Sequence, residues 1–284
     1  MKLLKFAQIN LVNLAVFVAV LGCAEQDFKS GSAGGKKNNP DKGSDATPSQ
    51  KPQSDSPSDM IQTDQGTIDC KKSSKGKIIV SNDEWAFSEA GMAAAPDAKQ
   101  YAKNVAVWLG GCEGRGYGKF HAYSNNFSLT APSLAKEFSD VGHTWSSGFS
   151  IDLTPEGLSQ YDWIFLAGPV PDIAKLVPLL VDFVQKGGGL YISAGTLGNA
   201  AVEAGWWNPV IQRFGMQYAS GYNGIKGNIN INESLHPIFK GVKQLYQNNG
   251  NSISLVAPLS PKTKIYVSSG SQGLYAIYDG GKSD

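Results

Sequence analysis

The sequence predicts an α/β fold: a doubly wound, mostly parallel sheet followed by a β-rich C-terminal part. Between residues 119 and 194, short strands alternate with helices through short loops, which is typical of parallel strands joined by crossover helices. Residues 162–167 (DWIFLA) form a continuous apolar run, as expected of a strand that is buried on both faces. After residue 215, strand-like segments joined by turns replace the helices.

Composition divides the 284 residues into three predicted parts: a signal peptide at 1–22, a tether at 23–66 and a globular domain at 67–284. The tether is rich in Ser, Lys, Asp, Pro, Gly, Gln and Asn, and it cannot bury enough apolar surface to offset the entropy of ordering. The net charge is +1, so no global field attracts nucleic acid, and we expect no nucleic-acid partner.

The N-terminus has the layout of a secretory signal. Lys2 and Lys5 precede an apolar run at 11–21, which is short for a membrane span. The stretch VLGC, which ends at Cys23, resembles the lipobox of bacterial lipoproteins. That resemblance implies that Cys23 is acylated and anchors the protein in a membrane, and Ala24 implies the outer membrane, facing the periplasm or the surface. A plain secreted protein that is cleaved nearby is the alternative.

The other two cysteines, Cys70 and Cys112, predict one disulfide, because exported proteins meet an oxidising compartment. A loop of that length adds about 4 kcal/mol to stability in the chain-entropy model. Two free thiols are the alternative. The sequence has no CxxC pair and no Cys/His cluster, so we expect neither a metal site nor a cofactor.

The first predicted elements of the domain alternate between strand and helix. The β-branched run at 78–80 is a short strand, and apolar residues at helical spacing predict a helix at 96–109. The sequence KFHAYS at 119–124 is the next strand. Thr130 is the expected N-cap of a helix at 131–141, which a glycine ends.

The alternation continues through the middle of the domain. We expect a strand at 143–149 and a helix at 154–160, with a threonine N-cap and a proline in its first turn. The apolar strand at 162–167 leads to an amphipathic helix at 172–186, where an internal proline predicts a kink. A KGGG turn then leads to a strand at 190–194.

The last third of the chain changes character. A helix is predicted at 200–214, with a break at Asn208-Pro209. The chain stops after a GGK turn that resembles a hairpin without its returning strand, and we expect either a truncated or a disordered C-terminus. Five further strands are predicted around Tyr218 and Ile229 and at 253–256, 265–268 and 274–278.

The order of these motifs resembles the class I glutamine amidotransferase-like superfamily, and in particular its ThuA-like members. The resemblance rests on KFHAYS, VGH, YDWIFLAG, KGGG and LYISAG, followed by the late His-Pro segment SLHPI at 234–238. It covers roughly residues 119–256, and it implies a flavodoxin-like or amidotransferase-like sheet.

The residues that do the chemistry in that superfamily are missing here. Its enzymes use a cysteine on the turn after a strand and a His-x-Glu pair, whereas this turn reads ISAGT and His236 is followed by Pro-Ile. A nucleophile needs an adjacent oriented base, so we expect a non-catalytic domain with a degenerate site. The alternative is a hydrolase in which His236 activates Ser193 or Thr196, with Glu203 or Asp152 behind it.

Ligands of open parallel sheets bind beyond the carboxyl ends of the strands. Small polar residues follow those ends here, and nearby aromatic residues are suited to a sugar or a peptide. One of the tryptophans Trp206 and Trp207 is expected to be core instead. The predicted ligand-binding residues are Ser124, Asn125, Thr196, Glu203, Trp207, Asn208 and Tyr222.

Asp83, Glu84 and Trp85 follow the first strand and are placed to reach the same cleft. A metal held by Asp83, Glu84 and either His121 or His236 is conceivable, but no ligand spacing supports it. The sequence therefore predicts an anchored domain that binds a glycan, a peptide or an envelope protein. A hydrolase of envelope carbohydrate and a structural scaffold are the alternatives.

Overall fold

The computed structural model describes residues 60–63, 66–69, 76–110, 118–233 and 235–281. The predicted signal peptide, Cys23, Cys70 and Cys112 lie outside these ranges. Strands β1 (Met60–Thr63) and β2 (Gly66–Asp69) form an antiparallel pair, where the sequence predicts the end of the tether and the start of the domain.

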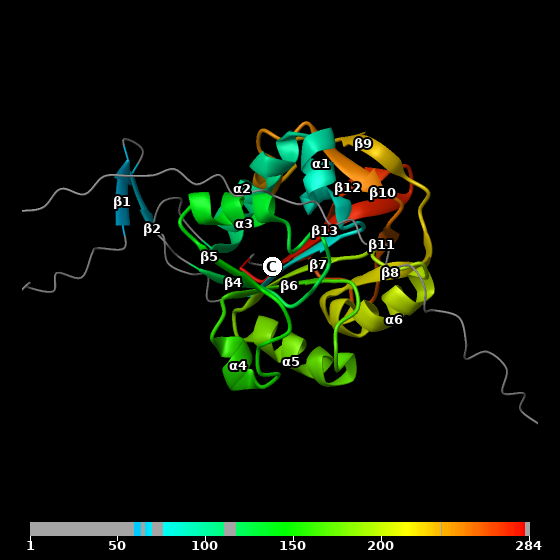
Figure 1. The fold of residues 1–284 in the computed structure, drawn as a ribbon, viewed down its shortest axis with the longest axis horizontal. Coiled ribbons are helices and arrows are strands. Elements are labelled where there is room, and N and C mark those ends of the chain that lie inside the picture. Colours follow the sequence, from blue (N-terminus) through cyan, green and yellow to red (C-terminus); the bar gives the residue numbers. More distant parts are fainter. Residues whose placement is uncertain (1–59, 64–65, 70–75, 111–117, 234, 282–284) are drawn as a thin grey trace, which may run out of the picture. The chain divides into compact units, whose positions relative to one another are not determined.

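A nine-stranded mixed sheet forms the centre of the fold (Figure 1). Half of it is parallel, with neighbouring strands in the order β5 (Thr144–Ser147), β4 (Lys119–Ala122), β6 (Trp163–Ala167), β7 (Gly189–Ser193) and β3 (Lys77–Ser81). Beyond β3 follow the antiparallel strands β13 (Gln272–Asp279), β11 (Asn251–Leu255) and β8 (Met216–Tyr222), and β12 (Thr263–Ser269) pairs with β13.

The prediction of a mostly parallel sheet therefore overstated the parallel share of the strands, because the β-rich C-terminal part joins the same sheet. Its strands follow one another through turns and not through long helices, and turns of that kind connect antiparallel strands. Strands β9 (Lys226–Asn230) and β10 (Gln244–Asn248) form a separate antiparallel pair. Strand β10 was not predicted.

Helices cover both faces of the sheet, so the α/β class is confirmed. Figure 1 shows α1 (Glu89–Ala94), α2 (Asp97–Gly110) and α3 (Pro132–Asp140) on one face. The other face carries α4 (Pro155–Ser159), α5 (Ile173–Gln185) and α6 (Ala200–Ile211). Among the described helices, none is long and apolar enough to cross a membrane.

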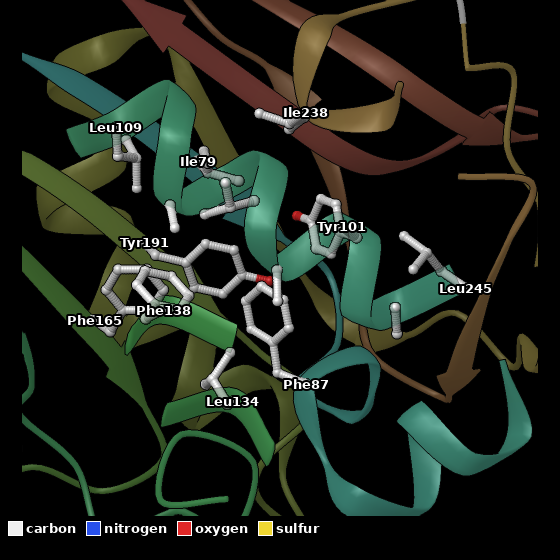
Figure 2. Close-up of a cluster of buried hydrophobic side chains, with 14 of the residues drawn as sticks. Ile79, Phe87, Tyr101, Leu109, Leu134, Phe138, Phe165, Tyr191, Ile238 and Leu245 are labelled. Carbon is white, nitrogen blue, oxygen red and sulfur yellow. The ribbon is translucent and has the colours of Figure 1, made fainter. Parts of the chain in front are cut away.

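Each face of the sheet carries its own buried core. Aromatic rings dominate the core beneath α2, where Tyr191 stacks on Phe165 with ring centroids 4.9 Å apart and also meets Phe87 at 4.9 Å (Figure 2). All five residues of β6 are buried, as its continuous apolar run predicts. The sheet is therefore held rigidly between two helical layers, which fixes the loops at its strand ends.

The predictions of where helices begin and break were correct for some helices and wrong for others. Thr154 caps α4 as predicted, because its hydroxyl accepts a hydrogen bond from the Gly157 N–H at 3.0 Å. Thr130 does not cap α3; its hydroxyl donates to the carbonyl of Asn126, and Ala131 takes the N-cap position. The predicted break before Pro209 is also absent, since α6 continues through this residue.

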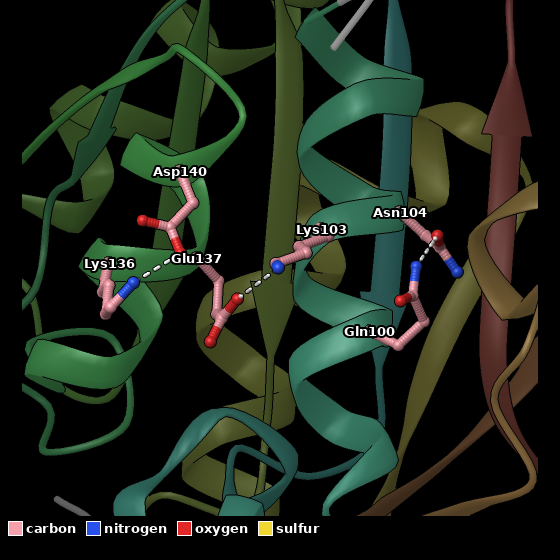
Figure 3. Close-up of polar contacts among 6 residues, drawn as sticks. All are labelled: Gln100, Lys103, Asn104, Lys136, Glu137 and Asp140. Carbon is pink, nitrogen blue, oxygen red and sulfur yellow. Dashed lines mark hydrogen bonds and ion pairs between the residues drawn. The ribbon is translucent and has the colours of Figure 1, made fainter. Parts of the chain in front are cut away.

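Polar contacts hold α2 to its neighbours (Figure 3). The Lys103 ammonium lies 3.3 Å from the Glu137 carboxylate of α3. On the other side of α2, the Asn104 side-chain amide donates to the carbonyls of Ile238 at 3.1 Å and Lys240 at 2.7 Å. These bonds fix the late His-Pro segment against α2.

Candidate functional site

The loops that follow the parallel strands meet at one edge of the sheet, which we call the carboxyl edge. A side-chain carbon built on Gly168, after β6, would lie 3.7 Å from Cβ of Asn126, after β4, and 3.8 Å from Cβ of Thr196, after β7. The loop after β3 contains Asn82, Asp83 and Glu84. This edge is where an open parallel sheet binds its ligands.

Glu203 organises the turn after β7. Its carboxylate accepts hydrogen bonds from the N–H groups of Gly195 at 2.9 Å and Thr196 at 3.2 Å, and from the Thr196 hydroxyl. Glu203 lies in the first turn of α6 and is fully buried. The structure thus brings together two of the predicted residues, Thr196 and Glu203.

Asp83 and Glu84 lie beside this turn. The Asp83 carboxylate accepts from the N–H of Trp85 at 2.7 Å and from that of Asn248 in β10 at 2.8 Å. A Cβ atom on Gly195, whose φ is +80°, would lie only 2.8 Å from Oε2 of Glu84. The backbone of Gly195 therefore approaches the Glu84 carboxyl so closely that any side chain at this position would clash with it.

Burial alters the ionisation of all three acids. Loss of hydration raises the pKa of Glu84 to about 9, and the neighbouring Asp83 charge adds to the shift. Burial also raises the pKa of Asp83 to about 7, although hydrogen bonds from Trp85 and Asn248 oppose it, and burial raises the pKa of Glu203. At neutral pH, Glu84 is a neutral carboxylic acid that can donate a hydrogen bond.

Several buried polar atoms at this edge have no hydrogen-bond partner in the described chain. They are both amide atoms of Asn82, Oε2 of Glu84 and Oγ of Ser193. Asn82 and Ser193 are fully buried, and Glu84 is 5% exposed. Buried polar groups are normally paired, so the unpaired groups at the ends of β3 and β7 make this edge the candidate functional site.

Aromatic side chains border the acids. The Trp85 ring lies 5.1 Å from the Phe127 ring and 6.0 Å from the Tyr246 ring, and Phe127 is 48% exposed. Sequence reasoning missed Phe127, Tyr246 and Asn82. Phe127 was open to prediction because it directly follows the Asn-Asn pair at the end of β4, whereas Tyr246 reaches the edge through β10, which was not predicted.

Trp207 and Asn208 were wrongly predicted to bind ligand. Trp207 is fully buried in the core beneath α6, whereas Trp206 is partly exposed and packs against that core. The Asn208 side chain bonds both backbone groups of Tyr218, at 3.0 and 2.8 Å. These two residues hold α6 against β8.

The remaining predicted residues have separate roles. The buried Ser124 hydroxyl donates to the Ala167 carbonyl at 2.5 Å and accepts from the Asn126 N–H, so it ties β4 to β6. Asn125 is exposed beside it. Tyr222, at the end of β8, is half-buried; burial raises its pKa, and the nearby Glu203 and Glu84 add to the shift.

His236 lies away from the carboxyl edge. Its ring packs on Trp108, at 4.9 Å, and the Trp108 carbonyl accepts a hydrogen bond from Lys77 at the amino end of β3. Ser193 pairs in register with Ser81, at the carboxyl end of β3. Four residues of strand, roughly 13 Å, separate Lys77 from Ser81.

The predicted hydrolase geometry is therefore wrong. His236 instead caps the short 3-10 helix η3 (Pro237–Phe239), where its Nδ1 accepts from the Ile238 N–H at 3.4 Å. Asp152 is exposed in the loop before α4, a helix on the opposite face of the sheet from α2. The structure does not bring His236 together with Ser193, Thr196 or Asp152.

The conceivable metal site is not assembled either. Among the Asp, Glu, His and Cys residues that the structure describes, no group of three is arranged to hold a metal ion. His121 is engaged elsewhere, because its ring nitrogens bond to the Ser146 hydroxyl at 2.8 Å and to the Gly148 carbonyl at 3.0 Å.

The carboxyl edge thus offers a neutral acid, unpaired amide and hydroxyl groups, and a partly exposed aromatic ring. This combination suits the binding of a polar ligand that carries hydrogen-bonding groups and some apolar surface. Comparison of the chain with family models, with curated proteins and with solved structures finds no match.

Proposed function

We propose that this protein is a lipid-anchored protein of the bacterial envelope whose α/β domain binds a glycan, a peptide or an envelope protein without catalysing a reaction. The VLGC stretch at Cys23 and the preceding apolar run support the anchor and an outer-membrane location. Intact-mass measurement of the native protein tests the anchor. An acylated, processed Cys23 is expected, and an unmodified cysteine would contradict it.

We also propose that the domain is a doubly wound, flavodoxin-like member of the amidotransferase-like superfamily with a degenerate site. Its five parallel strands and two helical layers are compatible with this assignment. The separation of His236 from the turn after β7 supports the loss of catalysis, because a nucleophile without an adjacent base is not activated.

The observation that carries the binding function is the set of unpaired, buried polar groups on Asn82, Glu84 and Ser193. Among the proposed ligands, a glycan fits best. Its hydroxyl groups both donate and accept hydrogen bonds, and the exposed ring of Phe127 beside Trp85 can stack on the apolar face of a sugar.

A glycan array probed with the purified protein tests this function. We expect retention of a subset of oligosaccharides and its loss in Phe127→Ala. Leu259→Ala is the matched control, because Leu259 is also an exposed hydrophobic residue, at 72%, but lies in the loop between β11 and β12 and not in a loop that follows a parallel strand. If no oligosaccharide is retained, or if both variants behave alike, glycan binding at this edge is excluded and a scaffold role is favoured.

One observation favours a second candidate function, hydrolysis of envelope carbohydrate by an acid pair. Asp83 and Glu84 are adjacent, and their pKa values are raised to about 7 and about 9. Carboxyls with different pKa values can act as base and acid in one site. Release of reducing ends from a retained oligosaccharide, abolished in Glu84→Gln, would support this function. An oligosaccharide recovered intact would exclude it.

A further inference from the structure

Residues 255–261, which lead from the end of β11 to β12, form an exposed segment that we call the apolar loop. Its sequence, LVAPLSP, contains no charged residue. Leu259 is 72% exposed, the largest value among the exposed large hydrophobic residues of the described chain, and Leu255 is 39% exposed. Ala257, Pro258 and Pro261 are exposed beside them. A contiguous apolar patch at the surface marks a contact with a protein or with a membrane.

The base of the apolar loop is fixed by hydrogen bonds. The Val256 N–H donates to the carbonyl of Gly215 at 3.0 Å, and the Thr263 hydroxyl donates to the carbonyl of Phe214 at 2.7 Å. Two of the seven residues are prolines, whose φ angle is fixed. The loop therefore holds Leu259 in solvent without having to be ordered when it meets a partner.

A hollow of about 780 Å³ lies beside the apolar loop. The rest of its lining comes from α5, α6 and the 3-10 helix η2 (Gln212–Phe214). Asp182 is the one acid of this lining, and Lys186 pairs with it at 2.8 Å. The apolar residues of the lining are Ala257, Pro258, Val177, Pro178, Val181 and Pro209. The hollow therefore extends the apolar surface of the loop onto the two helices.

Positive charge flanks the apolar loop and the hollow. Arg213 lines the hollow and Lys264 follows the loop; both are exposed, and neither forms an ion pair within the described chain. No acid occurs between residues 255 and 264. Asp279 of β13 lies beside Lys262 in the paired strand, so Arg213 and Lys264 remain to match a partner that carries negative charge.

We infer that the apolar loop docks on the lipid surface to which the protein is anchored, with Leu259 entering the lipid and Arg213 pairing with an anionic headgroup. This inference rests on the proposed anchor at Cys23. Apolar side chains beside cations are how peripheral segments bind anionic membranes, with the apolar part about 5–10 Å deep at the boundary of headgroups and acyl chains.

Two observations favour a membrane over a protein partner. The outermost apolar group is a single leucine, whereas a stable protein interface buries about 800 Å² on each partner. The proposed acyl groups at Cys23 hold the chain at a lipid surface, so the loop meets lipid at a high effective concentration. Acyl groups alone do not fix the orientation of the domain, and a second contact through the apolar loop orients it.

Quenching of tryptophan fluorescence by brominated lipid tests the inference. The purified full-length protein is reconstituted into vesicles of brominated phosphatidylcholine and phosphatidylglycerol. Leu259→Trp and Leu235→Trp each add one tryptophan to the six of the wild type. Leu235 is the matched control, because it is also exposed, at 39%, but precedes η3, which is bonded to α2 on the other face of the sheet.

We expect the emission added by Leu259→Trp to be quenched about twofold or more, and that added by Leu235→Trp to be unchanged. Combining Leu259→Trp with Arg213→Gln should reduce the quenching, as should vesicles that lack phosphatidylglycerol. Combining it with Lys99→Gln, which removes an exposed cation on α2, should have no effect.

Flotation of the vesicles separates the two proposals. If the protein floats with the vesicles but Leu259→Trp is quenched no more than Leu235→Trp, the docking of the loop on lipid is overturned and the proposed anchor stands; a protein partner is then favoured for the loop. Quenching that survives both Arg213→Gln and the loss of phosphatidylglycerol would overturn the pairing with anionic headgroups. A protein that does not float with the vesicles would overturn both the anchor and the docking.

Discussion

Replacing Glu84 by glutamine is expected to stabilise the protein at neutral pH. The carboxyl group is 5% exposed, has an unpaired oxygen, and its pKa is raised from 4.5 to about 9 by burial and by Asp83. Glutamine keeps the shape and the polar groups of the side chain but does not titrate. The substitution thus imitates the neutral acid of the folded state.

The sign and size follow from proton linkage. Between pH 4.5 and 9, the folded protein holds the Glu84 proton and the unfolded chain has lost it. The free energy of unfolding therefore falls as pH rises through this window, by about 1.4 kcal/mol per pH unit. At pH 7 the free energy of unfolding of the wild type is therefore about 3 kcal/mol lower than it is below pH 4.5. Glu84→Gln does not titrate and avoids this loss.

Urea unfolding of both proteins, followed by tryptophan fluorescence between pH 4 and 8, measures this difference. Asp83 titrates in both proteins, so its contribution to the pH dependence of stability largely cancels in the comparison. The stability advantage of Glu84→Gln should be small near pH 4 and should grow steadily toward pH 8. A difference that does not vary with pH, or a variant that is less stable at pH 8, would refute the assignment of a buried neutral carboxyl.

Three further sets of variants test the remaining structural assignments by the same unfolding assay. Trp207→Ala should cost about 3–5 kcal/mol, because it empties a fully buried site, and Trp206→Ala should cost clearly less; equal costs would contradict the assignment of Trp207 to the core. A double-mutant cycle on Lys103 and Glu137 should give a coupling of about 0.5–1 kcal/mol that shrinks in salt, whereas a salt-independent coupling would show that the pair is not ionic. Phe127→Ala should change stability by less than about 0.5 kcal/mol, because Phe127 is 48% exposed; a large loss would mean that its ring is structural.

Much of the fold could be predicted from periodicity. The apolar run of β6, the helical spacing of α2 and the capping threonine of α4 all have local causes. The pairing of β13 with β3 could not be predicted, because it joins residues far apart in the sequence. Pro209 was misread because a proline within α6 is tolerated where tertiary packing holds the helix.

The part of the candidate site that is local in sequence could also be predicted. Thr196 and Glu203 are seven residues apart, and a turn followed by a helix brings them together. Trp207 was misassigned because the sequence did not show which of two adjacent tryptophans faces the core. His236 was misassigned because its position depends on packing against Trp108 of α2, a contact between distant segments.

The most direct test of the account is a carbon-13 NMR titration of the glutamate carboxyl groups, with Glu84→Gln used to assign the Glu84 signal. The account predicts one glutamate that titrates near pH 9 and is absent from the variant, and a signal that shifts when a retained oligosaccharide is added. If Glu84 instead titrates near 4.5, its ordinary value, the account of a buried neutral carboxyl is contradicted. If the Glu84 signal does not shift when the oligosaccharide is added, the carboxyl edge is not the binding site described.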